Sequence, residues 1–242
     1  MSAEACSLER FRKDTAEHQM QILLDSGMHR HLRFRRPGTN TYGFDVVTWP
    51  GYLAISGDMG GSMFTRLPDM FEFFRKDQRW YERNPGGLPI NPSYWAGKLA
   101  ANDGEKKRFN IDRFARVVRD HFDGYMSEQD SDADGFEVAR DALWKHITAE
   151  VLAADYDDSN QAIAGWSQFE VGQDNTGIFL GPADVEAYAG WFDDFKVADV
   201  WEYVSSIESY TFHLIWRMYA VAHAVQTYDA HHASFAAPVT GA

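Results

Sequence analysis

The spacing of apolar side chains predicts a helix and then a strand at the start of the chain. Apolar residues recur at roughly helical spacing over residues 7–26, and Ser26-Gly27 is typical of a helix end, because glycine readily adopts the left-handed conformation that follows many helices. From residue 31 the pattern changes: polar and apolar side chains alternate over residues 31–35, in the order HLRFR. A period of two is typical of a half-buried strand.

Three more short strands are predicted directly after this one. Aromatic and β-branched residues are frequent in each, and turn residues separate them: Pro50-Gly51 between the first two and the glycine-rich run 57–61 before the last. Strands joined by such tight turns form an antiparallel meander, and we expect the first helix to cover one of its faces. The three strands lie over residues 42–49, 52–56 and 62–66.

The remainder of the chain is predicted to be mainly helical, so the fold class is α+β: an N-terminal helix packed on a four-stranded antiparallel meander, followed by a mainly helical C-terminal half. Residues 1–108 then form the α+β region, residues 109–232 an acidic helical region and residues 233–242 a flexible tail; one continuous domain also fits. The expected helices cover 68–74, 94–99, 112–126, 134–152, 184–195 and 199–228, with an irregular stretch at 155–182 that includes a short hairpin near 169–180.

Charge changes this picture because it is unevenly distributed. The chain has 36 acidic and 23 basic residues, a net charge of -13. Residues 1–120 hold 19 basic and 15 acidic residues, whereas residues 121–242 hold only 4 basic and 21 acidic ones, a net of -17. Since charge governs long-range attraction more than it governs fold, we expect the acidic half to avoid nucleic acid; only the basic first strand, residues 31–35, is suited to such contact.

The composition also limits the cellular context. The single cysteine, Cys6, excludes an internal disulfide framework and a cysteine-based zinc site. The N-terminus is charged from Glu4 onward and lacks the apolar core of a signal peptide, and the most apolar helical stretch, 212–225, is interrupted by histidine and arginine. We therefore expect a cytoplasmic protein with no membrane partner.

An acidic motif near the middle of the chain has the spacing of a calcium-binding loop. EF-hand loops place oxygen ligands at positions 1, 3, 5 and 12 and glycine at position 6. Here Asp130, Asp132 and Asp134 occupy the first three, Gly135 the sixth and Asp141 the twelfth. An acidic loop whose aspartates cap the next helix explains the same residues, and calcium is the only cofactor that the sequence suggests.

The second group of candidate residues is basic and aromatic. Alternation along a strand places Arg33 and Arg35 on one face, Arg66 follows the fourth strand, and Trp49 and Tyr52 are close enough to stack on a base. Guanidinium groups bind phosphate and carboxylate, so a nucleotide or a signalling phosphate is the expected ligand. The alternative is a solvated face whose arginines pair with Asp45, Asp58 or the acidic half of the chain.

Other motifs do not support an enzyme. No metalloprotease, nucleophile-elbow or paired-cysteine signature occurs, and the glycine-rich turn 57–62 lacks the lysine of a phosphate-binding loop. His29 and His31 would share a strand face but have no third metal ligand nearby in sequence. We therefore assign no catalytic residue.

Four segments resemble a widespread family of uncharacterised proteins encoded by tailed phages and prophages: 30–38 (RHLRFRRPG), 44–53 (FDVVTWPGYL), 57–60 (GDMG) and 64–74 (FTRLPDMFEFF). Residues 91–96, 201–203 and 213–228 resemble later landmarks of that family. The resemblance covers residues 9–100, is looser at the C-terminus and leaves out 127–160, where the calcium-like loop falls. It implies a viral accessory protein in the bacterial cytoplasm and carries no activity.

Three functions are therefore expected, in this order. The first is a non-enzymatic phage or prophage protein that binds a host protein or complex, its acidic half imitating nucleic acid by charge complementarity, for host takeover or defence evasion. The second is a module that binds a small phosphorylated ligand on the arginine-rich strand. The third is a hydrolase or nuclease that uses a divalent metal at the aspartate cluster, residues 130–141.

Overall fold

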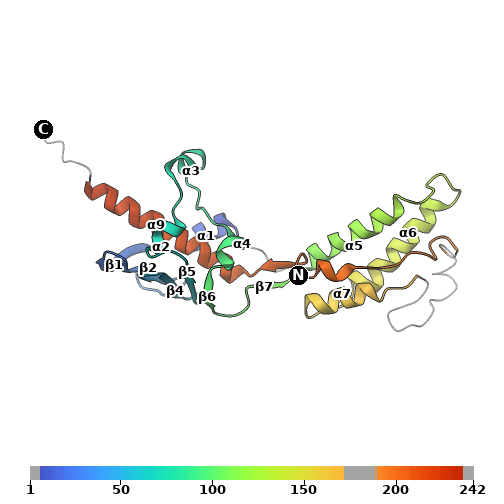
Figure 1. Cartoon of the computed structure of the whole chain (residues 1–242), viewed down its shortest axis with the longest axis horizontal. Helices are drawn as coiled ribbons and strands as arrows, with labels where there is room; N and C mark the ends of the chain where they lie inside the picture. The colour runs from blue at the N-terminus through green and yellow to red at the C-terminus, as the bar shows by residue number, and fades with distance from the viewer. Residues whose placement is uncertain (1–5, 172–187, 189, 237–242) are drawn as a thin grey trace. The chain divides into compact units, whose positions relative to one another are not determined.

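The computed structural model describes residues 6–171, 188 and 190–236, and shows an α+β chain divided into two compact units. Residues 6–106 and 210–236 form the sheet unit, and residues 107–209 form the helical unit, which is inserted between them in the sequence (Figure 1). The first division lies two residues from the boundary predicted at 108/109. Residues 210–236, however, pack with the sheet and not with the helical region to which the sequence assigned them.

The sheet unit is built on six antiparallel strands that follow one another in chain order. The predicted meander is present as the four central strands, β2 to β5, and one strand is added at each edge. The strands are β1 (Gln19–Ser26), β2 (His29–Arg35), β3 (Phe44–Trp49), β4 (Tyr52–Gly57), β5 (Ser62–Thr65) and β6 (Leu99–Asn102).

The prediction of one helix over residues 7–26 is wrong. Helix α1 (Leu8–Thr15) is capped by Ser7, whose hydroxyl accepts a hydrogen bond from Arg10 N, and the rest of the predicted helix is strand β1. Residues 19–22 read Gln-Met-Gln-Ile, which alternates as a strand does, and the leucines after them fit either period. Gly27, at φ +61°, then closes the β1–β2 hairpin instead of ending a helix.

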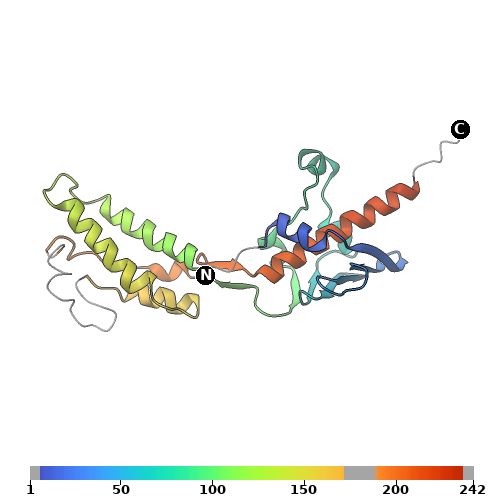
Figure 2. The same cartoon turned by 180° about the vertical axis from the view of Figure 1, so that it is seen from behind.

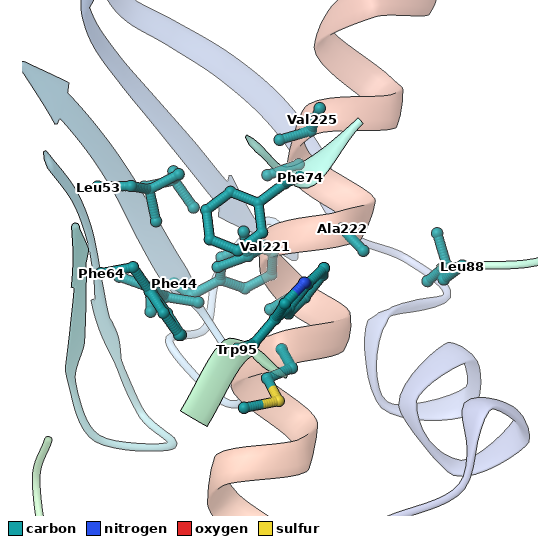
Figure 3. Packing of buried hydrophobic residues seen from close by; sticks show 14 of the residues in the cluster. Phe44, Leu53, Phe64, Phe74, Leu88, Trp95, Val221, Ala222 and Val225 are labelled. Atoms are coloured by element: carbon teal, nitrogen blue, oxygen red, sulfur yellow. The ribbon is translucent and has the colours of Figure 1, made fainter. Parts of the chain in front are cut away.

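The core of the sheet unit lies on one face of the sheet, where helix α9 packs against it. The long C-terminal helix α9 crosses it, and Figure 3 shows Phe44, Leu53 and Phe64 pointing from the strands toward Val221 and Val225 of that helix. These side chains are buried, so the core of the unit lies between sheet and helix. Besides α1, the helices of this unit are α2 (Met70–Phe74), α3 (Gln78–Arg83), α4 (Pro92–Ala96) and α9 (Phe212–Ala236).

A network of charged and aromatic side chains fixes α9 to the sheet. Arg30 of β2 donates two hydrogen bonds of 2.9 Å to Asp69, whose carboxylate also caps α2 by accepting from Phe71 N. The Arg30 guanidinium lies over the rings of Phe71 and Tyr228, 4.7 and 5.4 Å from their centroids, and the Tyr228 hydroxyl donates to Asp25. Charge pairing and cation–π contact thus replace the water that the buried Arg30 loses on folding.

The helical unit has a separate hydrophobic core, which includes Phe114, Val118, Leu143 and Trp166. The helix predicted over 112–126 is confirmed, and the one over 134–152 is present as an α-helix that continues into a π-helical turn. The elements are β7 (Lys107–Phe109), α5 (Ile111–Met126), α6 (Phe136–Ile147), the π-turn (Thr148–Leu152), α7 (Ser159–Ser167), a 3-10 helix (Val200–Tyr203) and β8 (Glu208–Tyr210), which pairs with β7.

Three predictions for this part of the chain are corrected. The stretch 155–182 was expected to be irregular, yet it contains α7, whose first turn is capped by Asp158 accepting from Asn160 N and Gln161 N. The single helix expected over 199–228 is instead a 3-10 helix, a strand and then α9. The hairpin near 169–180 lies for the most part outside the described residues. The helix expected over 184–195 is wrong over residues 190–195, which form turns and a bend; most of its earlier residues lie outside the described part of the chain. Among the described helices, none is both long and apolar enough to cross a membrane.

Candidate functional site

The face of the sheet opposite α9, here called the outer face, carries the polar side chains of the four central strands. Along β2 to β5 burial alternates, except at the end of β4, where Ser56 and Gly57 are both exposed. Leu32, Phe34 and their neighbours toward α9 are buried, whereas outer-face residues are half-buried or exposed. Strand pairing arranges the outer face in rows. Its members on β2 to β5 are His29, His31, Arg33, Arg35, Asp45, Val47, Trp49, Tyr52, Ala54, Ser56, Met63 and Thr65.

Asp45 is the centre of a cluster on this face. It lies directly across the sheet from Arg33 and accepts hydrogen bonds from Arg33 Nη2 at 3.0 Å and from Arg33 Nε at 3.2 Å. His31 Nε2 lies 2.7 Å from the same carboxylate, and Arg35 Nη2 lies 3.5 Å from it. Burial raises the pKa of Asp45, but the hydrogen bonds from Arg33 and His31 more than offset this and hold it below its ordinary value. Asp45 is therefore ionised at neutral pH and orients two guanidinium groups.

An open hollow of about 680 Å³ lies beside this cluster. Its lining residues come from β1, β2 and the turn that follows β2, and most of them carry hydrogen-bonding side chains. One arginine nitrogen, Arg33 Nη1, bonds to no described residue. The hollow thus offers positive charge and N–H donors, the features that bind phosphate or carboxylate. Its lining includes Gln19, Gln21, Arg33, Arg35, Arg36 and Asn40.

The predicted aromatic residues lie farther along the same face. Trp49 and Tyr52 face each other across the β3–β4 hairpin with ring centroids 5.4 Å apart and planes inclined by 20°. Trp49 is four residues from Asp45 on β3, which corresponds to about 13 Å along a strand. The structure therefore places Arg33, Arg35, Trp49 and Tyr52 on one surface but in two groups.

Arg66 does not join the arginine cluster. It follows the last residue of β5, Thr65, which pairs with Tyr52, so it belongs to the aromatic end of the sheet. Arg66 is exposed and forms no hydrogen bond or ion pair with the described residues. The five expected ligand-binding residues therefore do not form one cluster. Arg33 and Arg35 lie together at Asp45, whereas Trp49, Tyr52 and Arg66 lie at the aromatic end of the sheet.

The pairing alternative is realised with one of the two aspartates that the sequence suggested. Asp45 holds Arg33 and Arg35, as described above. Asp58 instead accepts a hydrogen bond of 2.8 Å from the backbone N–H of Tyr42, a residue with a positive φ of 55°. Sequence reasoning missed Gln19 and Gln21, because it assigned them to a helix; their alternation with Met20 and Ile22 was the signal that places them beside β2.

The four aspartates of the calcium-like motif are not gathered around a point. No group of three or more His, Cys, Asp or Glu side chains suited to a metal ion occurs among the residues that the structure describes, which include all four. Asp130 accepts a hydrogen bond from Asp132 N, as in an ordinary turn, and Asp141 pairs with Arg140. Gly135 adopts φ +89° and precedes α6, the sharp bend that the motif requires. Calcium binding stays a prediction.

The fold separates charge more completely than the sequence halves do. The helical unit, 107–209, holds 22 acidic and 8 basic residues, a net of -14. Outside it the chain holds 14 acidic and 15 basic residues, a net of +1. Of the 19 acidic residues that the structure describes in the helical unit, 17 are exposed. Five of them fall within the ten residues 128–137, where α5 gives way to α6.

Comparison with protein-family models, curated proteins and solved structures finds no match to this chain.

Proposed function

We propose that this chain is a non-enzymatic phage or prophage accessory protein whose helical unit binds a basic, nucleic-acid-binding surface of a bacterial host protein. The observation that carries the proposal is the net charge of -14 on a unit of 103 residues, most of it on exposed carboxylates. A surface of this kind attracts a groove lined by lysine and arginine and competes with nucleic acid for it.

The arrangement of the acidic side chains favours recognition over simple solubility. The carboxylates of residues 128–137 extend from a turn between two helices, and those of residues 155–158 precede α7. Both groups are attached to elements with a shared hydrophobic core, so the spacing between charges is held by the fold. A rigid array loses less conformational entropy on binding than a disordered acidic tail does.

The experiment is affinity capture from a nuclease-treated bacterial lysate with the full chain as bait, washed at about 50 mM and about 200 mM salt. We expect one or more nucleic-acid-binding proteins to be retained at the lower salt concentration and to be released when duplex DNA is added. A retained protein that duplex DNA does not displace, or the retention of none, contradicts the proposal.

Charge reversal locates the surface. Changing Glu128, Asp132 and Asp134 to lysine alters three exposed side chains that form no side-chain hydrogen bond with a described residue, and it should abolish capture. The matched control reverses three exposed carboxylates of the sheet unit, Glu9, Glu17 and Glu82, which changes the net charge by the same amount. Equal loss with both variants would show that capture follows net charge alone and would refute a specific surface.

A further inference from the structure

We propose that the outer face of the sheet binds single-stranded nucleic acid, with backbone phosphates at Arg33 and Arg35 and bases stacked against the aromatic pair Trp49 and Tyr52. This inference concerns the sheet unit and is independent of the acidic surface discussed above. It combines three observations: a cationic hollow, an aromatic pair on the same face, and a row of apolar side chains on neighbouring strands between the two groups.

The cationic end carries more positive than negative charge. Arg33, Arg35 and Arg36 surround the hollow, whereas Asp45 is the one carboxylate among the described residues within ion-pair distance of the first two. Glu17 lies 3.8 Å from Arg36 through side chains that are both largely exposed, so water screens that pair. Asp45 accepts hydrogen bonds from Nε and Nη2 of the Arg33 guanidinium, which leaves Nη1 for a ligand. The guanidinium is therefore already oriented before a phosphate arrives, which reduces the entropy lost on binding.

The aromatic end offers an accessible ring. Tyr52 is 37% exposed and stacks on Trp49 across the hairpin. Aromatic faces on an open sheet stack bases without regard to sequence, because every base has a π-face. Because its ring is already stacked on that of Trp49, Tyr52 has few side-chain conformations to lose when a base binds.

Half-buried apolar side chains lie between the two ends. His31 pairs with Val47, Val47 with Ala54, and Ala54 with Met63. These residues form one row across strands β2 to β5, between the arginines and the aromatic pair. The two ends are about 13 Å apart along β3, too far for one phosphate ion to contact both. In a duplex the base faces are stacked on each other and cannot reach the rings, so the geometry favours a single strand.

The test is fluorescence anisotropy of the full chain with a labelled single-stranded oligonucleotide of mixed sequence, and with the duplex of the same length, over a series of salt concentrations. We expect the single strand to bind more tightly than the duplex. Each phosphate contact contributes about 0.7 to the slope of log affinity against log salt for single strands, so Arg33→Gln with Arg35→Gln should lower that slope by about 1.4. Arg36→Gln, whose side chain is exposed and lies outside the Asp45 cluster, should lower it by about 0.7 and is the variant to use if the double variant unfolds.

Matched controls distinguish this site from general attraction. Arg79→Gln with Arg83→Gln removes two exposed arginines of α3 and should leave affinity unchanged. Tyr52→Ala should weaken binding about tenfold, whereas Tyr94→Ala, which removes another exposed aromatic of the sheet unit, should not. The proposal is overturned if no strand binds at low salt, if the duplex binds as tightly as the single strand, or if the control variants reduce affinity as much as those on the outer face. If the wild-type chain captures no host protein, or if charge reversal leaves capture unchanged, while strand binding is intact, only the proposed function is overturned.

Discussion

His223 makes the stability of the sheet unit depend on pH between about 6.5 and 4. This histidine lies on α9 with its ring 5.4 Å from that of Phe34 and 5.8 Å from that of Phe11. Burial, with a smaller contribution from the nearby His18 and Arg12, lowers its pKa to about 4. An exposed histidine in the unfolded chain has a pKa of about 6.5.

The sign of the effect follows from proton linkage. A group whose pKa is depressed on folding binds more protons in the unfolded state, so acid favours unfolding. The contribution of His223 is fully present above pH 6.5 and is lost as the pH falls toward about 4. At pH 4.5 the two pKa values correspond to a loss of about 2.5 kcal/mol relative to pH 7.5. Asp45 and Asp69 also have lowered pKa values in the folded protein, so their contribution is lost only below the ordinary carboxyl pKa of about 4.

The assay is urea unfolding of the wild type and of His223→Leu at pH 7.5 and pH 4.5, with hydrogen exchange of β2 and α9 amides to assign the change to the sheet unit. We expect the variant to lose about 2.5 kcal/mol less than the wild type over this range, because leucine cannot be protonated. His213→Gln, at an exposed position on the first turn of the same helix, is the control and should behave as the wild type does. Equal pH dependence of wild type and His223→Leu would refute the reasoning.

Three further predictions test the fold and the remaining sequence hypothesis. Asp69→Ala removes both the α2 cap and the partner of Arg30, whose side chain is 9% exposed, and should cost about 3 kcal/mol in urea unfolding; Asp69→Asn, which keeps an oxygen for the cap, should cost less. Gly57→Ala places a Cβ 2.2 Å from the Gly43 carbonyl oxygen and should lower stability by about 2–3 kcal/mol, whereas Gly61→Ala, with its nearest neighbour at 3.5 Å, should stay within about 0.5 kcal/mol of the wild type. If residues 130–141 bind calcium, a calcium concentration a hundredfold above Kd raises stability by about 2.7 kcal/mol and Asp132→Ala removes that gain; an unchanged melting midpoint at millimolar calcium rejects the calcium loop.

Much of the fold could be predicted from local patterns, and the failures have a common origin. The central strands and helix α5 were predictable because their period of burial is unambiguous and turn residues or caps mark their ends. Residues 19–26 were assigned to a helix because Met20, Leu23 and Leu24 fit a helical spacing as well as a strand spacing. Pairing with β2 selects the strand, and pairing is a long-range contact that a local pattern does not contain.

The candidate sites show the same division. Sequence alone determined which residues are available: arginines alternating on one strand, aromatics on the next two, and an excess of carboxylates after residue 120. Only the tertiary structure decided that Asp45 lies opposite Arg33, because this depends on the register of β2 against β3. It also decided that α9 packs on the sheet and that the acidic excess is confined to residues 107–209. The physical reason is that side-chain chemistry is a property of each residue, whereas the proximity of charges is set by strand register and by the burial of apolar faces from distant parts of the chain.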